Sequence, residues 1–121
     1  MNGYLVDSNV ILGLFLDDPD WADWSETTLT KCGDQNRLFI NIVIYTEVSI
    51  GFKRIEELEK AIQMASFQML GIPKEALFLA GKSFIQYKKN RGLKSSPLPD
   101  FYIGAQAAVM DLDLITRDIN R

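Results

Sequence analysis

Short apolar runs alternate along the chain with longer segments in which apolar residues recur at helical spacing. The apolar runs predict buried strands at residues 4–6, 38–43, 69–70 and 112–116. The helical spacing predicts helices over residues 8–15, 21–31, 44–69 with a break near Lys53, 74–89 and 97–108. Strands that alternate with helices predict an α/β domain, in which a mainly parallel central sheet is flanked by helices.

Length and composition agree with one such domain, spanning residues 1–121. Apolar residues make up 47% of the 121 residues, which is enough to bury a core. No apolar run reaches the roughly 18 residues that cross a bilayer, so no membrane segment is expected. The single cysteine, Cys32, cannot form an internal disulfide, which favours a cytoplasmic location.

The most informative feature of the composition is the absence of histidine. It excludes Ser-His-Asp and Cys-His catalysis, and it excludes zinc sites that contain histidine. One cysteine cannot supply an all-thiolate zinc site either. Catalytic chemistry in this chain must therefore come from carboxylates, hydroxyls, Lys or Arg side chains, or a bound cation. Acids are plentiful, with 16 Asp and Glu against 13 Lys and Arg and a net charge of −3.

Of four acidic residues that stand out in this pattern, three fall at or near the carboxyl ends of the predicted strands and so predict the same edge of the sheet. Asp7 ends the first strand, Glu47 lies in the helix after the second strand, and Asp118 follows the last strand. Asp100 lies in the first turn of the helix that leads to that last strand. The functional crevice of a parallel sheet lies beyond the carboxyl ends of its strands, so these acids are expected to converge there.

Converging carboxylates repel one another, and a divalent cation relieves that repulsion. Mg²⁺ and Mn²⁺ prefer oxygen ligands, and a site of this kind activates water and orients a phosphodiester without histidine. Taken singly, each acid also has an ordinary explanation as a helix cap, a turn residue or a solvent-facing side chain. The combination of all four favours a metal site.

Four segments of the sequence together resemble the PIN-domain family and, more closely, VapC-type toxin ribonucleases. The segments are Tyr-Leu-Val-Asp-Ser-Asn-Val-Ile at 4–11, Tyr-Thr-Glu-Val at 45–48, Leu-Pro-Asp-Phe-Tyr-Ile-Gly-Ala at 98–105 and Leu-Ile-Thr-Arg-Asp at 114–118. Each is weak alone. In this order and at this spacing they are specific for the superfamily, moderately specific for the toxin branch, and run across essentially the whole chain.

The resemblance implies a Mg²⁺- or Mn²⁺-dependent endoribonuclease, which hydrolyses RNA phosphodiesters with a water activated by the metal. The motif positions assign the catalytic acids, which are Asp7, Glu47, Asp100 and Asp118. Three of them would be the metal ligands, namely Asp7, Asp100 and Asp118. Glu47 would complete the set, often through water. Asn9 and Thr116 match neighbouring polar positions that would hydrogen-bond the acids or the waters on the metal.

The toxin branch also implies partners, which are an antitoxin encoded beside the toxin and a second copy of the chain in a homodimer. The antitoxin would insert a segment, often carrying an Arg, into the acidic crevice. Two features depart from the family pattern. Relatives often have His where Gln106 stands, which puts in doubt a substrate contact from that position. Relatives also continue past the Arg-Asp motif, whereas this chain ends at Arg121, so its sheet is expected to lack one edge strand.

Basic residues near two of the acids are candidates for contact with RNA. They are Lys88, Lys89, Arg91, Lys94 and Arg117. The alternative for the first four is a solvated helix face and loop, and the net negative charge argues against broad nucleic-acid binding. Trp21 and Trp24 also could stack on bases, but aromatic residues at helical spacing more often pack in a core or a dimer contact.

Two other functions stay open at this point. A phosphoacceptor receiver is also an α/β domain of this size, but it needs adjacent acids after its first strand and a lysine after its last. Here Asp7 is followed by Ser8 and Asn9, and Arg117 is the nearest base. The other alternative is a non-catalytic interaction module on the PIN fold, which the intact set of four acids counts against.

Overall fold

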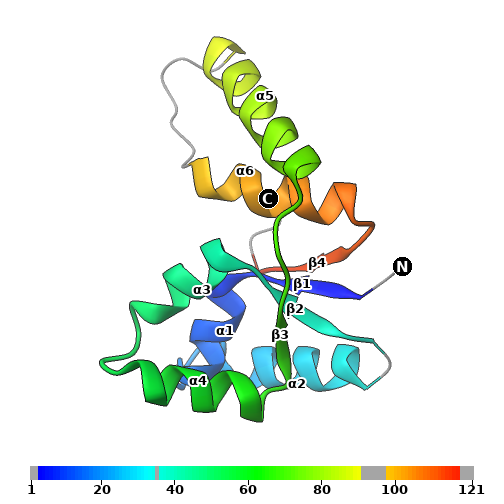
Figure 1. Ribbon diagram of the computed structural model, residues 1–121. Coiled ribbons are helices and arrows are strands. Elements are labelled where there is room, and N and C mark those ends of the chain that lie inside the picture. The colour runs from blue at the N-terminus through cyan, green and yellow to red at the C-terminus, as the bar shows by residue number, and fades with distance from the viewer. Residues whose placement is uncertain (1–2, 35, 91–97, 118–121) are drawn as a thin grey trace.

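Figure 1 shows the computed structural model, which describes residues 3–34, 36–90 and 98–117. One parallel sheet has the strand order β3-β2-β1-β4, with β1 (Tyr4–Val6), β2 (Leu38–Ile40), β3 (Phe67–Met69) and β4 (Asp113–Ile115). The helices are α1 (Ser8–Phe15), α2 (Ala22–Gly33), α3 (Ile42–Ser49), α4 (Ile55–Met64), α5 (Lys74–Asn90) and α6 (Leu98–Val109). The predicted α/β class and the parallel sheet are confirmed.

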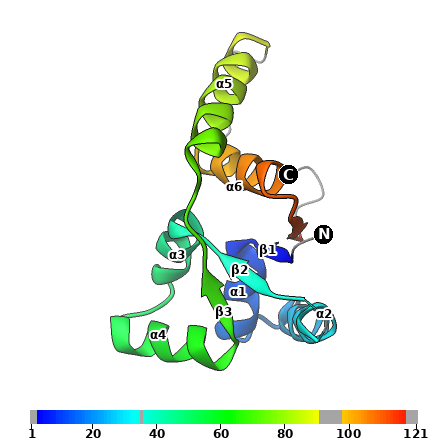
Figure 2. The ribbon, with the colours of Figure 1, turned by 45° about the vertical axis from the view of Figure 1, so that its right-hand side comes forward.

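The helices cover both faces of the sheet. α1, α2 and α4 lie on one face of the sheet, and α6 lies on the other face (Figures 1 and 2). α5 packs against α6. The strand order explains this arrangement. The chain steps from β1 to β2 to β3 in one direction and then returns across the sheet to β4, so right-handed connections place the returning helices on the opposite face. The order therefore reverses beside β1, where ligand crevices of α/β sheets form.

The core lies between the sheet and the helices on its two faces. Leu5 and Val6 of β1 are fully buried, and Ile40 of β2 is nearly so. Central parallel strands are covered on both faces, which is why they appear in the sequence as continuous apolar runs. Ile11 of α1 and Ile103 of α6 pack into this core from the two covering layers.

The predicted second strand, residues 38–43, is wrong in its last part. β2 ends at Ile40, and Asn41 caps α3 by accepting a hydrogen bond of 2.8 Å from the backbone N–H of Ile44. Asn strongly favours this capping position, and its side chain competes with the strand ladder for backbone groups. The predicted break near Lys53 is confirmed, since α3 and α4 are separate helices.

The third strand lies slightly earlier than predicted, over Phe67–Met69. α4 ends at Met64, and Ser66 adopts a left-handed conformation with φ +60°, which turns the chain into β3. Within the described ranges, no helix is long and apolar enough to cross a membrane. Residues 118–121 lie outside those ranges, so the expected lack of an edge strand stays a prediction.

Candidate functional site

Asp7 stands at the carboxyl end of β1 and is fully buried. Its Oδ1 accepts a hydrogen bond of 2.8 Å from the backbone N–H of Ser8, at the start of α1. Its Oδ2 accepts a second bond of 2.8 Å from the hydroxyl of Thr116, just beyond β4. A buried carboxylate is costly unless it is hydrogen-bonded, so these two donors hold it at the place where the strand order reverses.

Glu47, in α3, is linked to Asp7 through Ser8. The hydroxyl of Ser8 donates a hydrogen bond of 2.8 Å to Glu47 Oε1, while the Ser8 backbone N–H binds Asp7. Ser8 therefore bridges two of the four predicted acids and is a site residue that the sequence analysis missed. The available signal was its place between two motif residues, Asp7 and Asn9, at the predicted helix start.

Asn9 adds an oxygen that lacks a partner. Its side-chain Oδ1 is buried, and within the part of the chain that the structure describes it has no hydrogen-bond partner. Buried polar atoms are almost always satisfied, so this oxygen marks a position for an ordered water or a ligand. The carboxylates of Asp7 and Glu47, which Ser8 links, supply oxygen donors of the kind that Mg²⁺ and Mn²⁺ prefer, and a place for Asn9 beside them stays a prediction.

The other two predicted acids are less completely placed. Asp100 is half-buried in the first turn of α6, which begins on the side of the molecule where α3 lies (Figure 1). Asp118 lies outside the described residues. Among residues 3–34, 36–90 and 98–117, no three acidic or cysteine side chains gather closely enough to hold a metal ion. The structure thus joins Asp7, Glu47 and Thr116, and the four-acid metal site stays a prediction.

Comparison with known proteins identifies the family. The PIN domain family matches residues 4–120. The chain belongs to the PIN domain family. The receiver alternative is therefore not supported, whereas the resemblance of the four motifs to PIN domains is confirmed. No curated protein sequence matches this PIN domain significantly.

Solved structures share the fold of this PIN domain over most of its length. VapBC2 from Rickettsia felis, bound to a DNA fragment from their promoter, is 17% identical with a TM-score of 0.73, covering 96% of this chain and 87% of that one. A toxin–antitoxin complex from Klebsiella pneumoniae is 23% identical with a TM-score of 0.68, at 96% and 87% coverage. VapBC-1 from nontypeable Haemophilus influenzae is 21% identical with a TM-score of 0.71, at 97% and 87% coverage.

Arg117 of the PIN domain packs against the connection between α1 and α2. Its guanidinium lies over the ring of Trp21, 5.0 Å from the ring centroid, and its Nη1 is 3.8 Å from Asp18 Oδ2. Trp21 in turn meets Trp24 edge to face, with ring centroids 5.5 Å apart. These contacts anchor the segment that carries Thr116. Both tryptophans take part in packing contacts, although Trp21 is 37% exposed and Trp24 is 38% exposed.

The predicted basic residues are only partly described. Lys88 and Lys89 are exposed near the end of α5 that points away from the sheet (Figure 1). Lys88 Nζ lies over the ring of Phe84, 5.9 Å from its centroid. Arg91 and Lys94 lie outside the described residues. A role for these groups in guiding RNA stays a prediction.

Tyr45, in the motif that contains Glu47, ties α3 to α4. Its hydroxyl donates a hydrogen bond of 2.7 Å to Glu59 Oε2. This bond to a carboxylate, with smaller contributions from burial and from the Glu59 charge, raises the pKa of the Tyr45 phenol above its ordinary value. The bond therefore joins the helix that carries Glu47 to α4.

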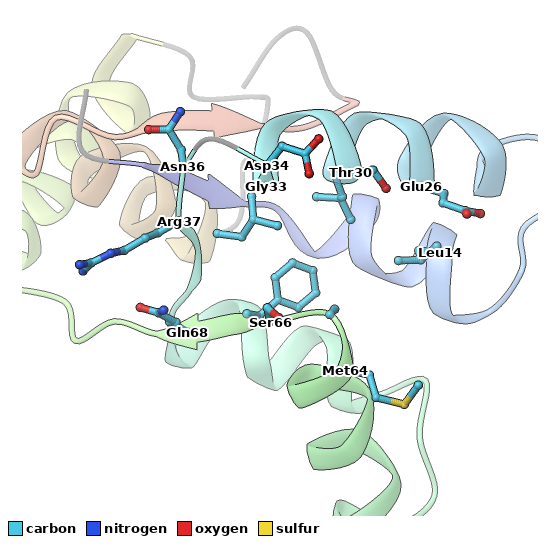
Figure 3. Close-up of a pocket in the computed structure, with 14 residues that line it drawn as sticks. Leu14, Glu26, Thr30, Gly33, Asp34, Asn36, Arg37, Met64, Ser66 and Gln68 are labelled. Carbon is cyan, nitrogen blue, oxygen red and sulfur yellow. The ribbon is translucent and has the colours of Figure 1, made fainter.

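A pocket of roughly 490 Å³ lies near the amino ends of β2 and β3. Leu38 and Phe67, which begin β2 and β3, form part of its wall. Figure 3 shows Glu26 and Thr30 of α2 and Arg37 among the polar side chains around it. None of the predicted site residues lines this pocket, so it is separate from the candidate site.

Proposed function

We propose that this PIN domain is a divalent-metal-dependent endoribonuclease that acts as the toxin of a toxin–antitoxin pair. The observation that carries the proposal is the buried carboxylate of Asp7, held by Thr116 and linked through Ser8 to Glu47 at the reversal of the strand order. The structures of similar fold support the toxin assignment, because one of them is described as a toxin–antitoxin complex.

Mg²⁺ or Mn²⁺ would supply a Lewis acid that activates water and stabilises the departing oxygen. Asp7, Asp100 and Asp118 would hold the metal, and Glu47 would orient water beside it. Cleavage would leave a 5′-phosphate and a 3′-hydroxyl.

The hydroxyls around these acids have a supporting role in the proposal. Thr116 and Ser8 would keep the carboxylates of Asp7 and Glu47 in the orientation that the metal requires. Asn9 Oδ1, which has no partner among the described residues, would accept a hydrogen bond from an ordered water in the crevice.

Cleavage of RNA with and without Mg²⁺ or Mn²⁺ tests this proposal, comparing the wild type with Asp100→Asn. The substitution keeps the shape of the side chain and removes its charge. We expect cleavage only with the metal. We also expect the variant to cleave RNA about 100-fold more slowly or worse, because loss of a residue that merely hydrogen-bonds a metal ligand already costs about 10–100-fold in activity. Thermal unfolding of both proteins controls for folding. Equal cleavage by the two folded proteins would contradict the catalytic assignment.

The proposed partners are an antitoxin and a second copy of the chain. An Arg-bearing antitoxin segment would complement the acidic crevice. The exposed apolar residues of α5, with Phe78 at 69% and Ile85 at 51% exposure, support a homodimer because they leave an uncovered apolar face. Copurification with the product of the adjacent gene and light scattering of the free protein test the two partners. The cytoplasmic location stays a prediction.

A non-catalytic interaction module on the same fold is the second candidate function. The observation that favours it is the absence, among the described residues, of three acids close enough to hold a metal. For such a module, the Mn²⁺ affinity would not differ between the wild type and Asp7→Asn. For the nuclease, Asp7→Asn would bind Mn²⁺ more weakly, so this comparison separates the two functions.

A further inference from the structure

A buried polar link joins α3 and α6, the two helices that carry Glu47 and Asp100. Asn41, which caps α3, and Gln106, in the middle of α6, are both fully buried. The Nδ2 of Asn41 donates a hydrogen bond of 2.8 Å to Gln106 Oε1. Two buried amides in an apolar core are costly unless their polar atoms are bonded, so the contact is specific rather than incidental.

The outer partners of the two amides fix the direction of the link. Asn41 Oδ1 accepts the backbone N–H of Ile44 at 2.8 Å, and Gln106 Nε2 donates to the carbonyl of Gly71 at 3.0 Å. Because the Asn41 oxygen is occupied by the helix cap, its nitrogen must face Gln106. Neither amide can therefore turn over without losing a bond. Gly71 lies between β3 and α5, so the link also fastens that connection.

Each of the two linked helices carries a predicted site acid. Glu47 lies in α3, where Ser8 holds it from the side of α1. Asp100 lies in the first turn of α6, about 9 Å along the helix axis from Gln106 at 1.5 Å per residue. A shift of α6 against α3 would therefore move Asp100 relative to Glu47 as a rigid unit.

We propose that Gln106, through Asn41, is a positioning residue that sets α6 against α3 and thereby places Asp100 relative to Glu47. The inference rests on the proposed nuclease function. Gln106 is fully buried and its described polar contacts are Asn41, Gly71 and Met110, so it acts without contacting RNA. Misplacement of a reacting group by about 1 Å costs about 100-fold in rate.

Three variants separate this role from general stability. Gln106→Leu removes both amide bonds, and Asn41→Ser keeps a hydroxyl that caps α3 while removing the donor to Gln106. Gln106→His at pH 8 should restore the link, because a neutral imidazole has one acceptor for Asn41 and one donor for Gly71. The control is Leu58→Val in α4, which loses core contacts away from the link.

The measurements are Mn²⁺ affinity by calorimetry, and kcat and KM for RNA at a temperature where every protein is folded. We expect Gln106→Leu and Asn41→Ser to lower kcat about 10- to 100-fold with KM nearly unchanged, and to weaken Mn²⁺ binding. Gln106→His should recover most of this loss, and Leu58→Val should keep the wild-type kcat despite a lower Tm.

The two failures are distinguishable. A wild-type protein that neither binds Mn²⁺ nor cleaves RNA would overturn the proposed function and this inference with it. An active wild type whose kcat and Mn²⁺ affinity survive both Gln106→Leu and Asn41→Ser would overturn this inference alone. A kcat for Leu58→Val as low as that for Gln106→Leu would also overturn it, because stability would then explain the loss. If Gln106→Leu does not fold, Asn41→Ser decides the result.

Discussion

The hydroxyl of Thr116 donates a hydrogen bond of 2.8 Å to Asp7 Oδ2, which joins residues 109 positions apart at the ends of two neighbouring strands. The backbone supports the same junction, because the N–H of Asp7 donates to the carbonyl of Ile115 at 2.9 Å. The pairing of β1 with β4 thus places Thr116 beside Asp7. Among the predicted acids that the structure describes, Asp7 is the only fully buried one.

Thr116→Val should destabilise the protein by about 1–3 kcal/mol, because a hydrogen bond to a buried carboxylate is lost while the side-chain shape is kept. It should also weaken Mn²⁺ binding about 10-fold or more, since Asp7 loses the group that orients it. Urea unfolding and calorimetry measure the two effects. Thr116→Ser, which keeps the hydroxyl, is the matched control. If Thr116→Ser lost as much stability and Mn²⁺ affinity as Thr116→Val, the hydrogen bond to Asp7 would not explain either effect.

Ser8→Ala should lower RNA cleavage about 10- to 100-fold, because Glu47 loses the donor that holds it beside Asp7. The backbone N–H of residue 8 can still donate its hydrogen bond to Asp7 Oδ1, so stability should fall by only about 1 kcal/mol. Ser25→Ala is the matched control. Ser25 Oγ is buried and has no hydrogen-bond partner in the described part of the chain, so its removal should leave cleavage unchanged. Equal activity of the two variants would count against the Ser8 bridge.

Arg117→Met should destabilise the protein by about 1 kcal/mol, because it removes the stacking on Trp21 and the ion pair with Asp18. Methionine keeps the apolar stem. Urea unfolding at low and high salt gives the measurement, and the difference from wild type should shrink at high salt. Unchanged stability would contradict the anchoring of the segment after β4 by Arg117.

The pH dependence of stability should contain a contribution from Tyr45. Its hydrogen bond to Glu59 raises the pKa of the Tyr45 phenol in the folded state. The stabilising contribution of the bond is therefore fully present at pH values below the unfolded-state pKa of about 10. This contribution is lost as pH rises through the folded pKa. Tyr45→Phe should therefore lose less stability than the wild type above pH 10. Parallel stability curves for the two proteins between pH 8 and 12 would contradict the assignment.

Much of the fold could be predicted from the sequence, because the spacing of apolar residues and the positions of turn residues largely determine where each helix and strand forms. The helix over 74–89 agrees closely with α5, and the run at 4–6 is β1. The end of β2 could not be predicted in this way, because the apolar run continues on both sides of Asn41 and the strand ends where the Asn41 side chain caps α3 at Ile44. The spacing of apolar residues gives no sign that a single polar residue within such a run caps a helix.

Less of the site could be predicted, because it depends on contacts between distant segments. The motif positions predict site roles for Asp7, Glu47 and Thr116, and the structure brings these three residues together. Ser8 and Gln106 were not assigned roles, since a serine at a helix start and a glutamine on an apolar helix face show their partners only after the helices pack. Gln106, noted as a departure from the family pattern, is a buried link rather than a substrate contact.

Calorimetric titration with Mn²⁺ of the wild type and Asp7→Asn tests most directly whether this crevice holds a divalent cation. Asp17→Asn is the matched control, because it makes the same charge change at an exposed turn residue with φ +53°, a conformation that Asn tolerates. We predict binding by the wild type and by Asp17→Asn, and at least about 10-fold weaker binding by folded Asp7→Asn. Equal Mn²⁺ affinity in all three folded proteins would contradict the account.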